Sequence, residues 1–227
     1  MEQDLYIAKP DVIFIISPHA SLFEEAFSVN ARPELESNFG EFGDFTTKKI
    51  WQGSPEIAQQ ISEKVSSKNN NLRLIGRKEL DHGSSIPLFY LTDHLPNIKI
   101  LPFGFCSLEN KEHLEFGELL KNYILDTNLR IAVIASADLS HGLTTEAPAG
   151  LSKTGKEFDE KIVELLETKN TIGIANMEEN FVKEASECGY RSILILLGIT
   201  KNMNYSFRNY SYESPFGVGY LVGNFVL

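Results

Sequence analysis

The sequence has few cysteines, no long apolar run and a shortage of positive charge. Cys106 and Cys188 are the only cysteines among 227 residues, too few for a disulfide framework and not spaced as a CxxC zinc pair. Apolar runs such as residues 12–16 are too short to cross a bilayer, and the first residues lack the basic flank and apolar stretch of a signal peptide. We therefore expect a cytoplasmic protein in a reducing compartment.

Charge and absent motifs narrow the function classes further. The chain has 21 Lys and Arg against 31 Asp and Glu, a net charge of −10, so its surface repels nucleic acids and anionic membranes, and neither is an expected partner. It contains no P-loop and no GxGxxG, GxSxG or HExxH motif. The expected partner is a small molecule, and the sequence is also compatible with a homo-oligomer or a partner subunit.

Strand patterns predict the centre of the fold. Short β-branched apolar runs indicate buried strands, which we place at residues 11–16, 72–75, 98–103 and 130–135. The aromatic and β-branched end, residues 204–227, predicts two more strands joined by a turn at 213–216. The two late strands are our reason for expecting a mixed sheet.

Helical patterns alternate with these strands. Ser54 and Pro55 predict an N-cap and a first helical residue, and helical spacing continues at residues 155–168 and 172–185. Residues 190–197 fit either a buried strand or a helix, and the polar residues 66–71 predict a loop tip. We expect one α/β domain over residues 1–227, with a central mixed, mostly parallel sheet and helices on both faces.

Three of the five histidines follow predicted strands. His19 comes after residues 11–16, His82 lies a few residues past 72–75, and His141 follows 130–135. Ligands of open α/β sheets bind beyond the carboxyl ends of the strands, so these imidazoles are expected to meet in one crevice. The acidic neighbours Asp81 and Asp138 are suited to fixing an imidazole tautomer. For each histidine taken alone, a solvated bystander is the ordinary alternative.

Other titratable residues have less specific settings. His94 and His113 are interpreted as bystanders, with His113 on a solvated helix face. Glu187, just before an apolar run, is suited to capping a helix start, which its spacing favours, or to supplying the carboxylate of a two-histidine, one-carboxylate iron site. Cys188 is by its type more often a small buried apolar residue than a ligand.

The segments that carry these residues resemble a known superfamily. SPHA around His19, LDHGSSIPLFYL around His82, ASADLSHG around His141, SECGYRS around Glu187 and the closing SPFGVGYLVG are similar, in order and spacing, to the LigB-type class III extradiol dioxygenases. That superfamily also includes the MEMO-like proteins. The resemblance extends from residue 13 to residue 222 and is specific for the superfamily, though not for one reaction.

The resemblance implies a set of site residues. His19 matches the first metal ligand, Glu187 the carboxylate ligand, His141 the acid/base histidine, and His82 an active-site histidine near the substrate. The implied metal is Fe(II), with zinc or copper as alternatives. MEMO-like proteins place a cysteine in the site, which matches Cys188.

One expected ligand is missing. The superfamily's second ligand histidine should lie between His19 and His82, where this chain has no histidine and instead has Asp44 in FGDF. Either Asp44 or His82 completes the metal site, or metal binds weakly or not at all.

Two main functional hypotheses follow. The first is an Fe(II)-dependent extradiol dioxygenase that opens a catechol-type ring with O2, using His141 as the base and His82 as a hydrogen-bond donor. The second is a MEMO-like binding or accessory protein that keeps the pocket without ring cleavage. A zinc hydrolase using His19, His82 and Glu187 is a third hypothesis.

Overall fold

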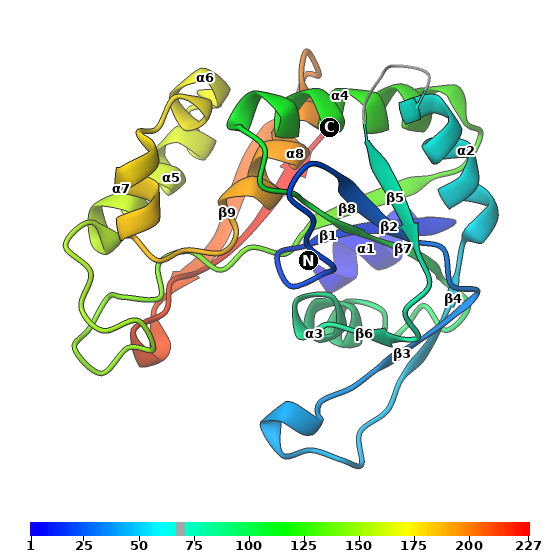
Figure 1. The fold of residues 1–227 in the computed structure, drawn as a ribbon, viewed down its shortest axis with the longest axis horizontal. Coiled ribbons are helices and arrows are strands. Elements are labelled where there is room, and N and C mark those ends of the chain that lie inside the picture. The colour runs from blue at the N-terminus through cyan, green and yellow to red at the C-terminus, as the bar shows by residue number, and fades with distance from the viewer. Residues whose placement is uncertain (67–70) are drawn as a thin grey trace.

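The computed structural model describes residues 1–66 and 71–227, so most of the predicted loop tip at 66–71 lies outside the described residues. Helices and strands alternate along the chain, and a central sheet runs through the larger part of the molecule (Figure 1). The strands are β1 Val12–Ser17, β2 Phe27–Asn30, β3 Glu34–Ser37, β4 Ile50–Gly53, β5 Leu72–Ile75, β6 Glu79–Leu80, β7 Lys99–Gly104, β8 Ile131–Ala135, β9 Ser206–Glu213 and β10 Tyr220–Val226. The α-helices are α1 Glu2–Ala8, α2 Pro55–Ser66, α3 His82–Leu91, α4 Asn110–Asp126, α5 Gly155–Glu167, α6 Thr171–Ala175, α7 Glu179–Glu184 and α8 Tyr190–Thr200.

The central sheet is mixed and mostly parallel, as predicted. Strand β1 lies between β7 and β8 and is parallel to both. The far edge of β7 is shared, because its start pairs with β4 in parallel and its end pairs with β2 in antiparallel fashion. Strand β5 then adds to β2, and β3 and β6 continue beyond β4. The predicted reason for the mixing was wrong, since the late strands β9 and β10 form a separate antiparallel sheet.

Helices cover both faces of β1, which explains its unbroken apolar sequence. Phe14 and Ile16 pack into a cluster with residues of α2, α4 and α8 on one face. Ile13 and Ile15 pack on the other face beside Leu88 of α3. All six residues of β1 are buried, as expected for a strand covered on both sides.

Several predicted elements need correction. Residues 72–75 form β5, but this is an edge strand with exposed central residues instead of a buried one. Residues 172–185 split into α6 and α7, and residues 190–197 belong to a helix, α8. Helix α2 begins at Pro55 as predicted, yet the buried hydroxyl of Ser54 has no hydrogen-bond partner and does not act as the cap. No described helix is long and apolar enough to span a bilayer.

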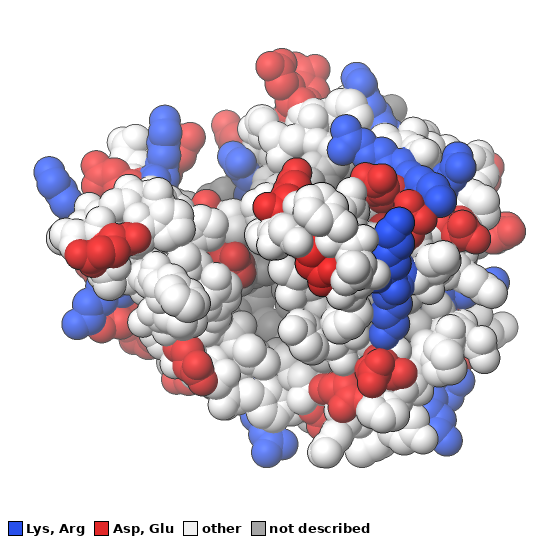
Figure 2. All heavy atoms as spheres, turned by 90° about the horizontal axis from the view of Figure 1, so that it is seen from below, with Lys and Arg blue, Asp and Glu red and all other residues white. Residues whose placement is uncertain are grey.

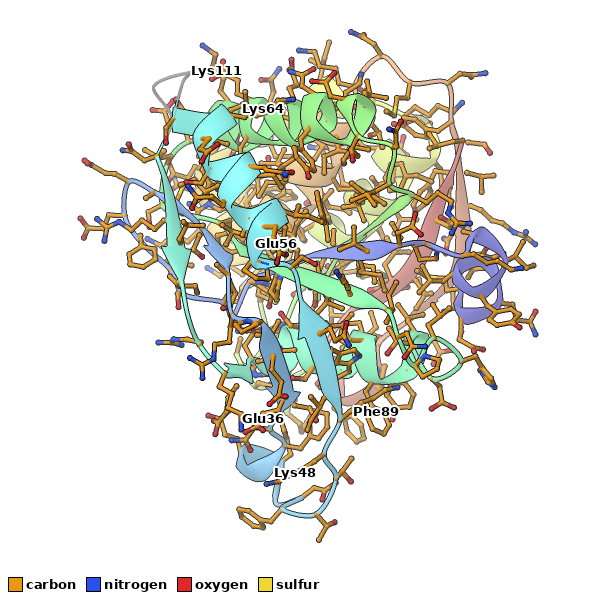
Figure 3. All side chains as sticks on the ribbon, turned by 90° about the vertical axis from the view of Figure 1, so that its right-hand side faces the viewer. Glu36, Lys48, Glu56, Lys64, Phe89 and Lys111 are labelled. Atoms are coloured by element: carbon orange, nitrogen blue, oxygen red, sulfur yellow. The ribbon has the colours of Figure 1, made fainter. Side chains whose placement is uncertain are left out.

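The connection between β3 and β4 extends away from the body of the molecule. Figure 3 shows Lys48 near the tip of this connection, below Glu36 of β3, while α2 runs from Glu56 to Lys64 at the opposite end of the view. Phe42 and Phe45 in the connection are 61% and 78% exposed. This connection carries the segment in which the missing histidine was expected.

His113 is buried, which overturns its assignment to a solvated helix face. It lies on the side of α4 that carries Phe116 and Leu120, and its side chain has no exposed surface. Its ring nitrogens lie 2.7 Å from the Glu109 carbonyl oxygen and 3.2 Å from that of Cys106. Burial lowers the pKa of the imidazole, with a smaller opposite effect from the Glu109 carbonyl.

This burial predicts acid sensitivity. The folded protein resists protonation of His113, whereas the unfolded chain takes up the proton near pH 6.5, so the stability conferred by neutral His113 is lost as the pH falls below about 6.5. The His113→Gln variant is expected to lose less unfolding free energy between pH 7.5 and pH 5.5 than the wild type does. Urea unfolding at the two pH values measures this difference. His94→Gln, at an exposed histidine, is the control, and an unchanged pH dependence in His113→Gln would contradict the prediction.

Candidate functional site

Two of the predicted histidines, His19 and His141, follow neighbouring parallel strands that end at the same edge of the sheet. His19 lies two residues past β1, and His141 lies six residues past β8, the parallel neighbour of β1. His82 is the first residue of α3 and follows β6, so the strand assigned to it from the sequence was wrong.

His19 and His82 lie side by side. Their ring centroids are 4.0 Å apart, with the planes inclined by 35°. Asp81 caps α3 by accepting a hydrogen bond from the Ser84 N–H at 2.9 Å, and it also accepts one from the hydroxyl of Ser17 at the end of β1. This shared carboxylate ties the two histidine-bearing segments together.

The electrostatic setting of His19 favours a neutral ring. Burial lowers the pKa of its imidazole, and the neighbouring His82 lowers it further, against opposing effects of Asp81 and Asp138. A neutral imidazole can accept a proton or bind a metal. His19 therefore has the protonation state that either role requires.

A second group of donors lies on the segments after β8 and before α8. One ligand atom each from Asp138, His141 and Cys188 lies within 4.8 Å of the other two. The His141 Nε2 atom is buried, is 3.8 Å from Asp138 Oδ2 and has no hydrogen-bond partner. We call Asp138, His141 and Cys188 the donor trio. A buried nitrogen without a partner is unfavourable unless a cation or ligand meets it, so the trio fits a bound metal ion.

The segments of the trio are fastened to each other through the backbone. The Gly189 N–H donates to the Asp138 carbonyl at 3.0 Å, and the His141 N–H donates to the Ser186 carbonyl at 3.2 Å. At Gly189 a Cβ atom would lie 2.4 Å from the Cα of Ala137. Glycine is therefore required for this close approach.

Asp159 of α5 holds the segment that carries His141 of the trio through a hydrogen bond to the neighbouring Ser140. Its buried carboxylate accepts hydrogen bonds from the Ser140 N–H at 2.8 Å and from the Tyr212 hydroxyl at 2.7 Å. Burial raises the pKa of Asp159, and the two hydrogen bonds oppose that rise. The sequence analysis missed this residue. An acidic residue one position after Phe158, on the apolar face of a helix, is the signal that identifies it.

Removing Asp159 is expected to disturb the trio. Asp159→Ala leaves the buried Ser140 N–H without a partner, at a cost of about 1–3 kcal/mol in unfolding free energy. It also removes the acceptor of the Tyr212 hydroxyl, but Tyr212 is 39% exposed and its hydroxyl can bond to water at a lower cost. Asp159→Asn keeps one acceptor oxygen and should lose less. Thermal unfolding with and without added metal measures both effects, and Asp93→Ala at an exposed carboxylate is the control. Equal unfolding temperatures for Asp159→Ala and the wild type would contradict this supporting role.

Cys188 has the chemistry of a metal-dependent thiolate. Burial, and then the charge of Asp138, raises the pKa of its thiol to about 12. At neutral pH the thiol keeps its proton unless a cation stabilises the thiolate. Cys188 is half-buried beside the site, so the sequence-based description of it as a small buried apolar residue misses its placement.

Glu187 borders a different cavity from the one that its neighbour Cys188 lines. Its carboxylate accepts a hydrogen bond from the Tyr190 N–H at 2.5 Å, at the start of α8, so the capping interpretation describes its contact. It opens into a separate cavity of about 370 Å³ with Lys183 and Arg191. Burial raises its pKa to about 7. Its role as a metal ligand stays a prediction, as do those of His19 and His82.

The contacts that the structure shows for the Asp44 carboxylate lie within its own turn and include neither His19 nor His82. Its carboxylate accepts hydrogen bonds from the Thr46 and Thr47 N–H groups, each at 2.9 Å, within its own turn, and these bonds lower its pKa. Phe42 from the same connection does reach the site, with its ring edge-on to His82 at 5.5 Å. The β3–β4 connection therefore contributes an aromatic side chain to the site.

Members of both groups border one cavity of about 590 Å³. Its walls come from α3, the end of β8, α8 and the β9–β10 hairpin, and His19, His82, Asp138 and Cys188 line it. Figure 2 shows the surface hollowed between the part that holds α5 to α7 and the larger part, with mainly uncharged side chains around the hollow. The cavity is suited to a small apolar molecule that reaches the donor trio.

Comparison with known proteins agrees with this architecture. The sequence profile of the family described as the catalytic LigB subunit of aromatic ring-opening dioxygenase matches residues 1–223. A protein of Clostridium acetobutylicum is 28% identical over 227 residues, covering 96% of this chain and 48% of that protein. A MEMO1 family protein of Methanosarcina barkeri is 26% identical over 158 residues, covering 69% of this chain and 56% of that protein. The chain thus spans about half the length of these curated relatives.

A solved structure supports the fold. The crystal structure of an uncharacterized protein of Escherichia coli has a TM-score of 0.68 at 20% identity, covering 97% of this chain and 88% of that one. The profile match over nearly the whole chain, together with the MEMO1 family relative, confirms the resemblance of the sequence motifs. This chain belongs to the LigB family, within the superfamily that also contains the MEMO-like proteins.

Proposed function

We propose that this protein is a metal-dependent dioxygenase that opens the ring of a catechol-type substrate with O2. The observation that carries the proposal is the donor trio, of which Asp138 and Cys188 line an apolar cavity that two adjacent imidazoles also line. Asp138, His141 and Cys188 would hold the metal, with His19 on the neighbouring segment as a further donor. Iron is the proposed metal, and zinc or copper also suit a nitrogen, oxygen and sulfur set.

A bound iron supplies Lewis acidity and open positions for the substrate and O2. The protein contributes proton transfer and exclusion of water. His82 borders the cavity beside His19, so these imidazoles are placed to accept a proton from a substrate hydroxyl. The Phe42 ring contacts His82 in a T-shaped arrangement, with ring centroids 5.5 Å apart. The apolar walls limit access of water to the reacting ring.

The direct test is turnover. Purified protein is loaded with Fe(II) without oxygen and is then mixed with catechols of different substitution in air. Absorbance of a ring-opened product is the expected result. Absence of any such product across the series, from protein shown to hold iron, would refute the dioxygenase proposal.

A second candidate function rests on the composition of the trio. A thiol stands among its donors, and no histidine lies between His19 and His82. Both features favour a MEMO-like protein that binds metal without opening rings. Metal binding of the wild type without turnover of any catechol would support this candidate.

Metal affinity is expected to rise with pH in either case. The Cys188 thiol must release its proton to bind, so one proton leaves per metal bound and the affinity should increase by about tenfold per pH unit between pH 7 and 9. The Cys188→Ser variant should show a flatter dependence. Competition with a metal chelator at each pH gives the affinities. Parallel pH profiles for the two proteins would exclude thiolate coordination.

A further inference from the structure

The cavity beside the donor trio is unusually poor in positive charge. No Lys or Arg side chain among the described residues lines it, and Asp138 is its only acidic lining residue. The amino group of Met1, at the cavity wall, is already paired with Asp4 at 3.2 Å. A carboxylate on a substituent that lies among these walls, away from the trio and its metal, would leave water without a Lys or Arg side chain to replace the lost hydration, which is unfavourable.

The cavity is also larger than a bare catechol ring requires. It lies beside the end of β8 and the start of β10, where Asp138 and Tyr220 form an isolated bridge. Its walls are largely apolar and include Ile193 of α8, Phe225 of β10 and Ile86 of α3. A volume of about 590 Å³ lies within the range of sites that enclose drug-sized ligands.

We propose that the substrate of this site is an aromatic diol carrying an extended uncharged apolar substituent, and that diols with a carboxylate substituent are excluded. This inference rests on the proposed function for the aromatic diol itself. The ring would face the trio and the histidine pair, and the substituent would lie among the side chains of α3, α8 and the hairpin. Apolar contact along these walls supplies the preference for the uncharged ligand.

The test compares two catechols whose substituents have similar length. The substituent of 4-butylcatechol is uncharged, and that of 3-(3,4-dihydroxyphenyl)propionate is an anionic carboxylate. Their dissociation constants are measured by calorimetry on the metal-loaded protein without oxygen, so no turnover is needed. We expect the butyl compound to bind on the order of tenfold or more tightly. Equal or tighter binding of the propionate, or binding of neither compound, would overturn the inference.

A charge introduced into the wall makes the test sharper. Ile86 is 41% exposed at the cavity wall on α3, so Ile86→Lys can place an ammonium group at the cavity without burying it fully. This variant is expected to narrow or reverse the preference for the butyl compound. Leu125→Lys, at a 62% exposed position on α4 outside the cavity lining, is the matched control and should keep the wild-type preference. An unchanged preference in Ile86→Lys would contradict the proposed placement of the substituent.

The two proposals fail separately. Preferential binding of the butyl compound without ring opening would refute the dioxygenase and leave the ligand class standing. Ring opening together with tighter binding of the propionate would refute the ligand class and leave the dioxygenase proposal standing.

Discussion

The Cys188→Ser variant is expected to lose at least about a hundredfold in affinity for a divalent transition metal. Loss of an outer partner of a metal ligand typically costs 10- to 100-fold, so loss of a direct ligand should reach or exceed that range. The reason lies in the geometry, because the sulfur is one of three donor atoms within 4.8 Å of one another. Calorimetry or chelator competition measures the affinity. Cobalt(II) adds a spectroscopic readout, since a thiolate ligand produces a charge-transfer band.

The second cysteine provides the control for this experiment. Cys106 is fully buried in the core cluster beside the sheet and is remote from the trio in its contacts. Cys106→Ser should therefore keep the cobalt–thiolate band and the metal affinity, whatever its effect on stability. Retention of the band in Cys188→Ser would show that the sulfur is not a ligand. His141→Ala should weaken binding as well, because His141 supplies the nitrogen of the trio and its buried Nε2 has no hydrogen-bond partner.

The Gly198→Ala variant is expected to lose about 3 kcal/mol or more of unfolding free energy. Helices α4 and α8 cross closely at Gly117 and Gly198, and a Cβ atom on Gly198 would lie 2.2 Å from the Leu114 carbonyl oxygen. Backbone atoms on α4 cannot yield as a flexible side chain can, so the helices must separate. Because α8 also carries Ile193 of the cavity wall, the displacement should weaken ligand binding as well.

Chemical denaturation of Gly198→Ala gives the change in unfolding free energy. Gly76→Ala is the matched control, since a Cβ atom there meets no atom within 4 Å. Its unfolding free energy should change by less than about 1 kcal/mol, because the substitution acts only on the conformational entropy of the unfolded chain. Similar losses in both variants would show that the crossing of α4 and α8 is not the cause.

At the site, the sequence predicted the positions of strands β1 and β8 but not the roles of the individual donor side chains. The spacing of apolar residues correctly placed β1 and β8, and the parallel pairing of these strands brings the segments after them to one edge. Asp138 was interpreted as a partner that fixes an imidazole, yet its carboxylate lies among the candidate donors. Glu187 and Cys188 are adjacent in sequence and open into different cavities, because the turn before α8 directs the two side chains apart.

Burial of polar residues could not be predicted position by position. His113 occurs in a charged stretch, but the face of α4 that packs against the core includes it, and two carbonyl groups lie within hydrogen-bonding distance of its ring. Asp159 is buried for a related reason, since Ser140 and Tyr212 come from distant parts of the chain to meet its carboxylate. Such pairings depend on contacts across the fold and leave little trace in local periodicity.

The sequence by itself determined the α/β class, the mostly parallel sheet, the family and the segments that carry the chemistry, because apolar periodicity and motif order are local properties of the chain. Tertiary structure alone decided which donors converge. It brought Asp138 and His141 to Cys188, placed the Glu187 carboxylate at the start of α8, and left the apolar cavity without a Lys or Arg side chain among its described lining residues. The physical reason is that side-chain direction and desolvation depend on neighbours distant in sequence, and these exist only once the sheet and its helices have packed.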